Sequence, residues 1–200
     1  MNKTSKDMFK KQNKIGAEEL RIEKFSESHN EIINEFCSYE QELVDFLKED
    51  ALNQQQRKIS VTYLWFLRKT NELVGYLTVS PDCVKLKSIN SELSAKFQDK
   101  RINYKSLPAL KIGRLCVDNK FLKKGIGSLM IQFSIKLAIG MSKNVGCRFI
   151  YLDAKRNEDT SKDAIHFYKK IGFEIYKDKN KKETPMYRDI IQEIKELSDN

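Results

Sequence analysis

The chain has no long hydrophobic segment. No apolar run in its 200 residues approaches the roughly 20 residues that a membrane-spanning helix needs. The first residues, Met1–Lys14, are polar and rich in lysine, unlike the apolar core of a secretory signal peptide. We therefore expect neither a membrane-spanning segment nor a membrane partner.

Closely spaced cysteines are also missing. Cys37, Cys83, Cys116 and Cys147 are scattered along the chain and form no Cys-x-x-Cys pair. This spacing indicates neither a zinc site nor a disulfide framework. We expect reduced thiols, no metal site and a cytoplasmic protein.

Two common nucleotide-binding motifs are absent. The turn Lys123–Ser128 contains Gly125 and Gly127, but it lacks the Gly-Lys-Ser/Thr of a Walker A loop. It also lacks the Gly-x-Gly-x-x-Gly of a dinucleotide site. No internal repeat is visible.

The chain does contain a strand that leads through this turn into a helix. Leu115, Cys116 and Val117 form the apolar end of a strand over Ile112–Asp118. Apolar residues then recur at the spacing of one helix face, at Ile126, Leu129, Met130, Phe133 and Leu137.

The start of this helix is suited to an anion. The first N–H groups of a helix have no internal partner and carry the positive end of the dipole. Gly125 and Gly127 allow close approach to the backbone, and Lys123 and Lys124 add positive charge. The turn therefore fits a phosphate or pyrophosphate, although a plain structural turn explains the glycines equally well.

Most of the net charge of +9 lies in one segment, residues 85–124, which we call the basic segment. It holds eleven Lys/Arg and three acids, a net +8. Part of this charge suits phosphates at the turn, and the rest suits a polyanion such as RNA. A solvated lysine-rich surface is the alternative interpretation.

Length and composition favour one globular domain. We place it at residues 17–190, between a flexible tail over 1–16 and a C-terminal tail over 191–200. A long connection over Val84–Leu107 precedes the central strand, and connections of this length are often functional.

Periodicity and turn residues predict the other elements. A hairpin is expected at Val61–Leu67 and Leu73–Val79, ended by Ser80–Asp82. Its aromatics, Tyr63, Trp65 and Phe66, fit a core better than a stacking platform for bases. Strands are also predicted at Leu20–Phe25, Cys147–Asp153, Gly172–Tyr176 and Pro185–Arg188. Helices are predicted at Ser28–Cys37, over the segment from the capping box Ser38–Gln41 to Gln56, and near Ile89–Phe97.

A second motif follows the long helix. Ala164–Phe173 contains Phe-Tyr-x-x-x-Gly-Phe and comes after the apolar strand Arg148–Asp153. The order of strand, Gly-x-Gly helix, strand and helix with this motif resembles the GNAT acetyltransferase superfamily. The resemblance implies an α/β (α+β) fold with a mixed, twisted sheet of six or seven strands and helices on both faces.

The resemblance also implies a cofactor and its site. In this family the turn binds the pyrophosphate of acetyl-CoA, and a backbone N–H of the central strand polarises the acetyl carbonyl. Tyr168 matches the tyrosine that protonates the leaving thiolate in this family. A phenol with an ordinary pKa of about 10 is protonated at neutral pH and can donate that proton. A packed aromatic is the alternative for Tyr168. The implied acetyl-CoA contacts are Leu115, Cys116, Val117, Lys123, Lys124, Gly125, Ile126, Gly127 and Ser128.

The sequence departs from the family pattern at two places. Leu122 replaces the usual Gln or Arg, and Lys123 replaces a common glycine, which leaves backbone binding intact but removes a side-chain contact. Lys111–Val117 lacks the glutamate that many members use as general base. Glu72, Asp153 or a chain of waters remain candidates for that role.

A closer resemblance extends from about Phe36 to Phe173. Phe36–Leu47, Ser60–Tyr63 and Leu107–Asp118 resemble the GNAT branch that contains the tRNA-acetylating toxins of toxin–antitoxin pairs. In those toxins the acceptor is the amino group of aminoacyl-tRNA, and a basic surface holds the tRNA. The basic segment fits that role.

Three hypotheses follow. The first is an acetyl-CoA-dependent N-acetyltransferase that transfers an acetyl group to an amine by direct attack in a ternary complex. The second is toxin-like acetylation of aminoacyl-tRNA, and the third is a non-catalytic module that binds CoA or RNA. The acceptor, the oligomeric state (a homodimer included) and an antitoxin partner stay open.

Overall fold

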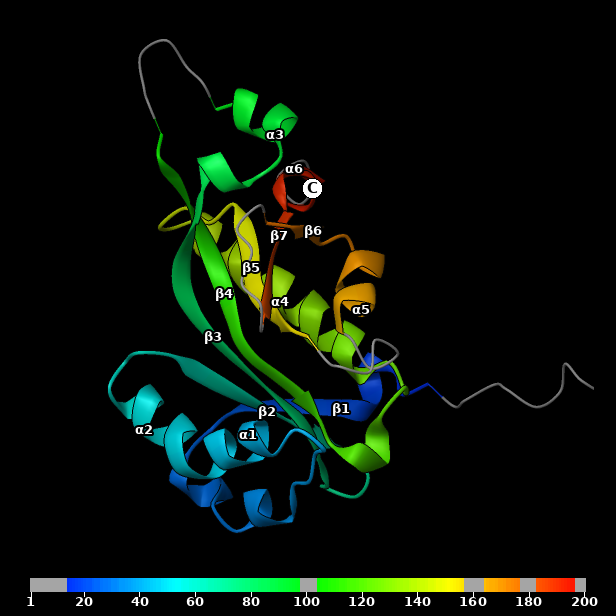
Figure 1. Ribbon diagram of the computed structural model, residues 1–200. Helices are drawn as coiled ribbons and strands as arrows, with labels where there is room; N and C mark the ends of the chain where they lie inside the picture. Colours follow the sequence, from blue (N-terminus) through cyan, green and yellow to red (C-terminus); the bar gives the residue numbers. More distant parts are fainter. Residues whose placement is uncertain (1–13, 98–103, 157–163, 177–182, 197–200) are drawn as a thin grey trace, which may run out of the picture. The chain divides into compact units, whose positions relative to one another are not determined.

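The computed structural model describes residues 14–97, 104–156, 164–176 and 183–196 (Figure 1). The described residues form two compact units. The first contains those up to Thr78 together with Arg114–Met130, and the second contains Val79–Gly113 and those from Ile131 onward.

The strands of the described residues form one seven-stranded sheet in the order β1-β2-β3-β4-β5-β7-β6. Strands β4 and β5 pair in parallel, whereas β1–β2, β5–β7 and β6–β7 pair antiparallel, so the sheet is mixed. This confirms the predicted α/β fold with a mixed sheet. The bounds are β1 Leu20–Lys24, β2 Val61–Leu67, β3 Leu73–Lys85, β4 Ser106–Val117, β5 Phe149–Lys155, β6 Glu174–Ile175 and β7 Glu183–Asp189.

Helical segments connect these strands. The α-helices are α1 Gln41–Asp45, α2 Ala51–Gln56, α3 Ser91–Ala95, α4 Ile126–Ser142, α5 Ala164–Lys170 and α6 Ile191–Glu196. The shorter segments are the 3₁₀ helices η1 Ala17–Glu19, η2 Glu27–His29, η3 Ile32–Glu35, η5 Leu86–Ser88 and η6 Asn119–Phe121, and the π-helical η4 Phe46–Asp50.

In the first unit a helical run covers the hairpin β2–β3. Segments α1, η4 and α2 follow one another without a break, and their apolar side chains join Leu64, Phe66 and Tyr76 in one buried cluster. The Tyr76 hydroxyl donates a hydrogen bond of 2.6 Å to the Leu43 carbonyl, which satisfies the phenol inside the cluster. Trp65 and Phe66 are 2% and 1% exposed, which confirms the core role predicted for these aromatics.

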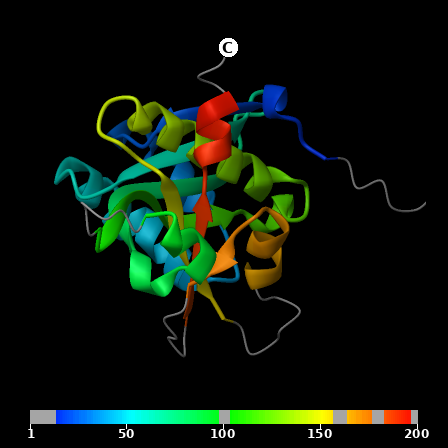
Figure 2. The same cartoon turned by 90° about the horizontal axis from the view of Figure 1, so that it is seen from above.

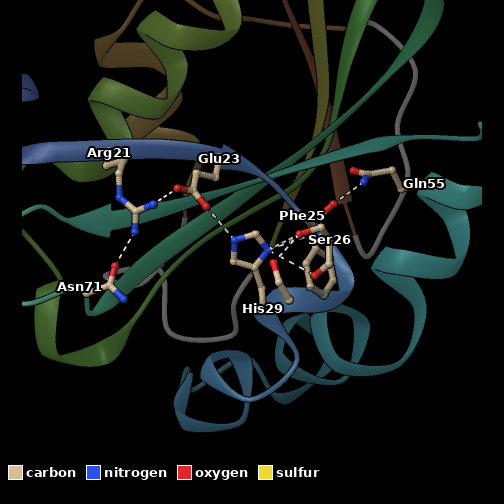
Figure 3. A network of polar contacts seen from close by, with 8 residues as sticks. Arg21, Glu23, Phe25, Ser26, His29, Gln55 and Asn71 are labelled. Carbon is tan, nitrogen blue, oxygen red and sulfur yellow. Dashed lines mark hydrogen bonds and ion pairs between the residues drawn. The ribbon is translucent and has the colours of Figure 1, made fainter.

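A polar network fixes the end of β1 in the same unit (Figure 3). The Ser26 N–H donates to His29 Nδ1 at 3.1 Å. On the other side of the ring, Nε2 lies 2.8 Å from Glu23 Oε2. Arg21 pairs with Glu23 and also donates to Asn71 in the β2–β3 turn, which ties that turn to β1.

Several predicted boundaries were wrong. Ser38 is not a helix cap, because its hydroxyl accepts the Glu40 N–H at 3.3 Å and α1 begins at Gln41. The hairpin does not end at Ser80–Asp82, since β3 continues to Lys85 through exposed residues around Pro81. A proline is compatible with a strand where its missing N–H is not needed.

The buried face of α4 also differs from the predicted stripe. Ile126 and Met130 are buried as expected, but Leu129, Phe133 and Leu137 are only half-buried. The buried positions further along are Ile131, Ser134, Ala138 and Ile139. Because α4 is apolar on most sides, helical spacing alone did not identify the face that packs.

In the second unit β5 is covered on both sides. Phe149 lies in a buried cluster with residues of η5 and α3, which confirms the helix predicted within the connection. Ile150 and Leu152 alternate with Phe149 along the strand, point to the opposite face and are equally buried. Helix α5 contacts β5 as well, and both figures show it beside β6 and β7 (Figures 1 and 2).

Within the described ranges, no helix combines the length and apolar character required to span a bilayer. Most of the tail predicted at 1–16, the polar residues 157–161 and the charged turn before β7 lie outside the described residues, as do Lys100 and Arg101 of the basic segment. The C-terminal tail predicted at 191–200 contains α6 in its described part.

Candidate functional site

The turn before α4 contains two residues in the left-handed region of the backbone. Lys123 and Gly125 both have left-handed backbone angles, with φ of +61° and +89°. A Cβ built on Gly125 would have no heavy atom within 4 Å, so one side of this peptide is open. The Lys124 ammonium lies 4.9 Å from the ring centre of Phe121, which holds its positive charge near the turn.

Helix α4 begins directly after this turn. The Gly125 carbonyl accepts the N–H groups of Ser128 at 3.1 Å and Leu129 at 3.2 Å, so Gly125 is the N-cap position. Ile126 and Gly127 stand at the first helical positions, where an N–H has no intrahelical acceptor. N–H groups without intrahelical acceptors, the positive end of a 17-residue helix and two lysines together suit a pyrophosphate.

The end of β4 leads into the turn. Leu115 and Val117 are half-buried, and Cys116 between them lies in the first unit's core. Burial raises the pKa of the Cys116 thiol to about 11, so it is a neutral packed side chain rather than a nucleophile. Gly75 on β3 faces this strand end, and a Cβ there would lie 2.6 Å from the Cys116 carbonyl oxygen.

Asp118 connects the strand end to two other segments. The residue is 3% exposed, and its carboxylate accepts the Cys37 N–H and the Lys120 N–H, both at 2.9 Å. The backbone of Asp118 donates to the Val74 carbonyl at 2.9 Å. These bonds fix the path of the chain at the point where it enters the turn.

Tyr168 lies in the second unit, on α5. Its ring is 9% exposed and packs edge-on against Phe167 and Phe173, at 5.1 and 5.6 Å between ring centres. Phe173 is buried, whereas Phe167 is half-buried. Both rings restrict the orientations that the Tyr168 side chain can take.

The model of the acetyltransferase (GNAT) family matches residues 29–173. The chain belongs to the GNAT acetyltransferase family. The protein is thus an N-acetyltransferase of a family that uses acetyl-CoA.

Solved structures of toxin acetyltransferases resemble this GNAT enzyme over most of its length. A tyrosine-to-phenylalanine mutant of KacT is 25% identical, with a TM-score of 0.74, and the match covers 90% of this chain and 99% of that one. AtaT complexed with acetyl-methionyl-tRNAfMet is 23% identical, with a TM-score of 0.73 and the same coverage. AtaTR bound with acetyl-CoA is 23% identical, with a TM-score of 0.69, also covering 90% and 99%.

The candidate bases of this GNAT enzyme lie in different surroundings. Glu72 accepts the Thr70 hydroxyl at 2.7 Å and lines a cavity of about 260 Å³ in the first unit, beside η6. Asp153 on β5 pairs with Lys111 at 2.8 Å and accepts the Tyr151 hydroxyl at 2.8 Å. His166 is exposed on α5.

Sequence reasoning missed the residues that hold these parts in place. Asp118 was interpreted only as the end of a strand, and its partner Cys37 is 81 positions away. The role of Arg188, which contacts the turn after α5, was also missed. Both side chains bind backbone groups, which any residue type can supply, so the sequence carries no matching partner signal.

Proposed function

We propose that this enzyme transfers the acetyl group of acetyl-CoA to the amino group of an aminoacyl-tRNA. The pyrophosphate of acetyl-CoA binds the turn Leu122–Ser128, and the end of β4 at Leu115–Val117 supplies the backbone N–H that polarises the acetyl carbonyl. Tyr168 is the general acid.

The geometry of the turn supports the cofactor assignment. Gly125 leaves open space beside the backbone, and the first N–H groups of α4 follow directly. Lys123 is exposed, and its ammonium is available for a phosphate oxygen. Leu122 cannot hydrogen-bond through its side chain, so the pyrophosphate depends on backbone donors and these two lysines.

The reaction requires a neutral amine, a polarised carbonyl and a proton for the leaving thiolate. The amine nitrogen attacks the acetyl carbonyl carbon, the carbon–sulfur bond breaks, and the nitrogen passes one proton to water, one of the candidate bases. Tyr168 donates its hydroxyl proton to the thiolate and is reprotonated from water. The packing of its ring between Phe167 and Phe173 limits its motion, which favours a group that must present one proton in one direction.

One observation carries the choice of acceptor. AtaT, which this chain matches over 99% of its length, was solved with acetyl-methionyl-tRNAfMet, an aminoacyl-tRNA whose amino group is acetylated. The charge of the basic segment, +8 over residues 85–124, suits a polyanionic acceptor of this kind.

The test measures thiol release from acetyl-CoA with three acceptors: methionyl-tRNA, uncharged tRNA and a lysine-containing peptide. We expect turnover with methionyl-tRNA only, and a fall in rate as salt is raised, because phosphate contacts release counterions. Turnover with the peptide alone would show a protein or small-amine acetyltransferase. Silence with every acceptor would favour a non-catalytic CoA or RNA module.

Tyr168→Phe removes only the hydroxyl group and tests the acid role. We expect turnover to fall by roughly 10²-fold or more. Tyr63→Phe is the matched control, because it removes a half-buried phenol from β2 and leaves the proposed site intact. Full activity in Tyr168→Phe would contradict the acid role.

A further inference from the structure

The turn after α5 is held by a side chain from another strand. Arg188 on β7 donates through Nη1 to the Ile171 carbonyl and through Nη2 to Glu193 on α6. Figure 2 shows α5, β6 and β7 next to one another in this part of the second unit. One guanidinium thus joins the end of α5 to α6.

A single hydrogen bond links the residue that Arg188 contacts, Ile171, to the backbone of Tyr168. The Ile171 N–H donates to the Tyr168 carbonyl at 3.2 Å, and the Phe173 N–H donates to the same carbonyl at 3.0 Å. Ile171 therefore accepts a hydrogen bond from Arg188 through its carbonyl and donates one to Tyr168 through its N–H.

The conformation of the turn allows the guanidinium to lie against it. Gly172 has a φ of +85°, which only glycine adopts readily, and its missing Cβ would stand 3.6 Å from Arg188 Cζ. The backbone of Arg188 is opposite Ile150 on β5, and the adjacent Tyr187 is opposite Glu174 on β6. The anchor is therefore built on a paired strand, which moves less than a loop.

Elementary electrostatics explains why α5 needs such an anchor. A helix of seven residues is short, and its last carbonyls find their donors in the turn that follows: Tyr168 accepts the Ile171 and Phe173 N–H groups, and Lys169 accepts that of Gly172 at 3.1 Å. These carbonyls carry the negative end of the helix dipole, so a cation with fixed donors stabilises them and opposes fraying. An arginine can bridge two acceptors with its planar fork, whereas a lysine offers one compact charge.

We propose that Arg188, oriented by Glu193, is the positioning residue that keeps Tyr168 in its productive orientation. The proposal rests on the acid role given to Tyr168 above. Arg188 does not act on the reacting atoms; it acts through Ile171.

A double-mutant cycle tests this role. We expect Arg188→Met to lower kcat on the order of 10-fold and to leave the KM for acetyl-CoA within about 2-fold, measured by thiol release with methionyl-tRNA or with the peptide if that is the acceptor. In the Tyr168→Phe background the same substitution has no further effect on kcat, because the group that it positions is gone. Arg188→Lys falls between the wild type and Arg188→Met.

Arg148→Met is the matched control. Arg148 also forms a two-bond pair with an acid of its own unit, Asp189, at 3.1 and 2.9 Å, and its side chain is 27% exposed against 24% for Arg188. We expect a comparable loss of thermal stability and an unchanged kcat.

The outcomes distinguish the positioning role of Arg188 from the reaction and the acid role proposed for Tyr168. Losses that multiply in the double mutant, or an equal loss of kcat in Arg148→Met, would make Arg188 a purely structural residue. Full activity in Tyr168→Phe would remove the acid role, and the absence of turnover with both acceptors would remove the proposed reaction. If Arg188→Met does not fold, Glu193→Gln and Arg188→Lys replace it in the double-mutant cycle with Tyr168→Phe.

Discussion

At the scale of single residues, Lys123 combines a favourable charge with an unfavourable backbone conformation. Its ammonium adds charge to the turn, but its φ of +61° is unfavourable for any residue with a Cβ. The left-handed conformation costs roughly 1–2 kcal/mol. A glycine would recover only part of this free energy, because it also makes the unfolded chain more flexible.

Lys123→Gly is therefore expected to raise the free energy of unfolding by roughly 0.5–1 kcal/mol. The KM for acetyl-CoA is expected to increase, because the turn loses one cation. Urea unfolding and initial rates measure the two effects. A lower KM would argue against an anion at this turn.

Lys58→Gly provides the control for that pair of measurements. Lys58 has nearly the same φ, +62°, and is exposed just after α2 in the first unit. It should gain similar stability with no change in KM.

At the scale of elements, Gly75 sets how closely β3 approaches the end of β4. A Cβ at this position would lie 2.6 Å from the Cys116 carbonyl oxygen and 2.5 Å from Met130 Cε. The methionine end can move, but the backbone oxygen belongs to a strand. The end of β4, which leads to the turn before α4, therefore leaves no room for a side chain at position 75.

We expect Gly75→Ala to reduce the free energy of unfolding by about 1–3 kcal/mol, the usual cost of overpacking. Gly140→Ala is the contrasting variant, because a Cβ at Gly140 in α4 meets nothing within 4 Å. It should raise stability by roughly 0.5–1 kcal/mol through helix propensity. Thermal unfolding of both variants measures the difference; equal effects would refute the close approach.

Spacing predicted some elements from the sequence, and the bonds between distant segments were not predicted. The alternating residues of β1 and the apolar run of α4 gave the right type of element, because local spacing differs between a strand and a helix, whereas Ser28–Cys37 forms the 3₁₀ segments η2 and η3 instead of one helix. Pro81 was taken as a stop, although β3 passes through it, because a strand end depends on which N–H groups have partners.

The same limit applied to the candidate site. The Gly-x-Gly turn and the helix bearing Tyr168 were recognisable as motifs, since their chemistry resides in adjacent residues. The hydrogen bonds from Arg188 to Ile171 and from Cys37 to Asp118 join segments far apart in sequence, and only folding brings them together.

At the scale of the whole molecule, buried weak acids make stability depend on pH. Burial is the main cause that raises the pKa of the Cys116 thiol from 9.0 to about 11 and that of the Tyr187 phenol from 10.0 to about 12. The folded chain therefore keeps protons that the unfolded chain releases. Stability is complete below about pH 9 and falls as the pH rises toward 11 and beyond.

For Cys116 alone the loss approaches about 2–3 kcal/mol near pH 11. Urea unfolding at pH 8 and pH 10.5 measures the fall, and Cys116→Ala is expected to make it smaller. The same fall in both proteins would assign the dependence to the buried tyrosines.

The location of the single tryptophan gives the molecule an internal optical probe. Trp65 is 2% exposed within β2 of the first unit, while the described part of the second unit contains tyrosines but no tryptophan. Its fluorescence therefore reports the solvation of one unit, whereas circular dichroism averages over both. Coincident unfolding curves from the two signals would mean that the units unfold in one cooperative transition. Separated curves would mean that the two units unfold independently and differ in stability.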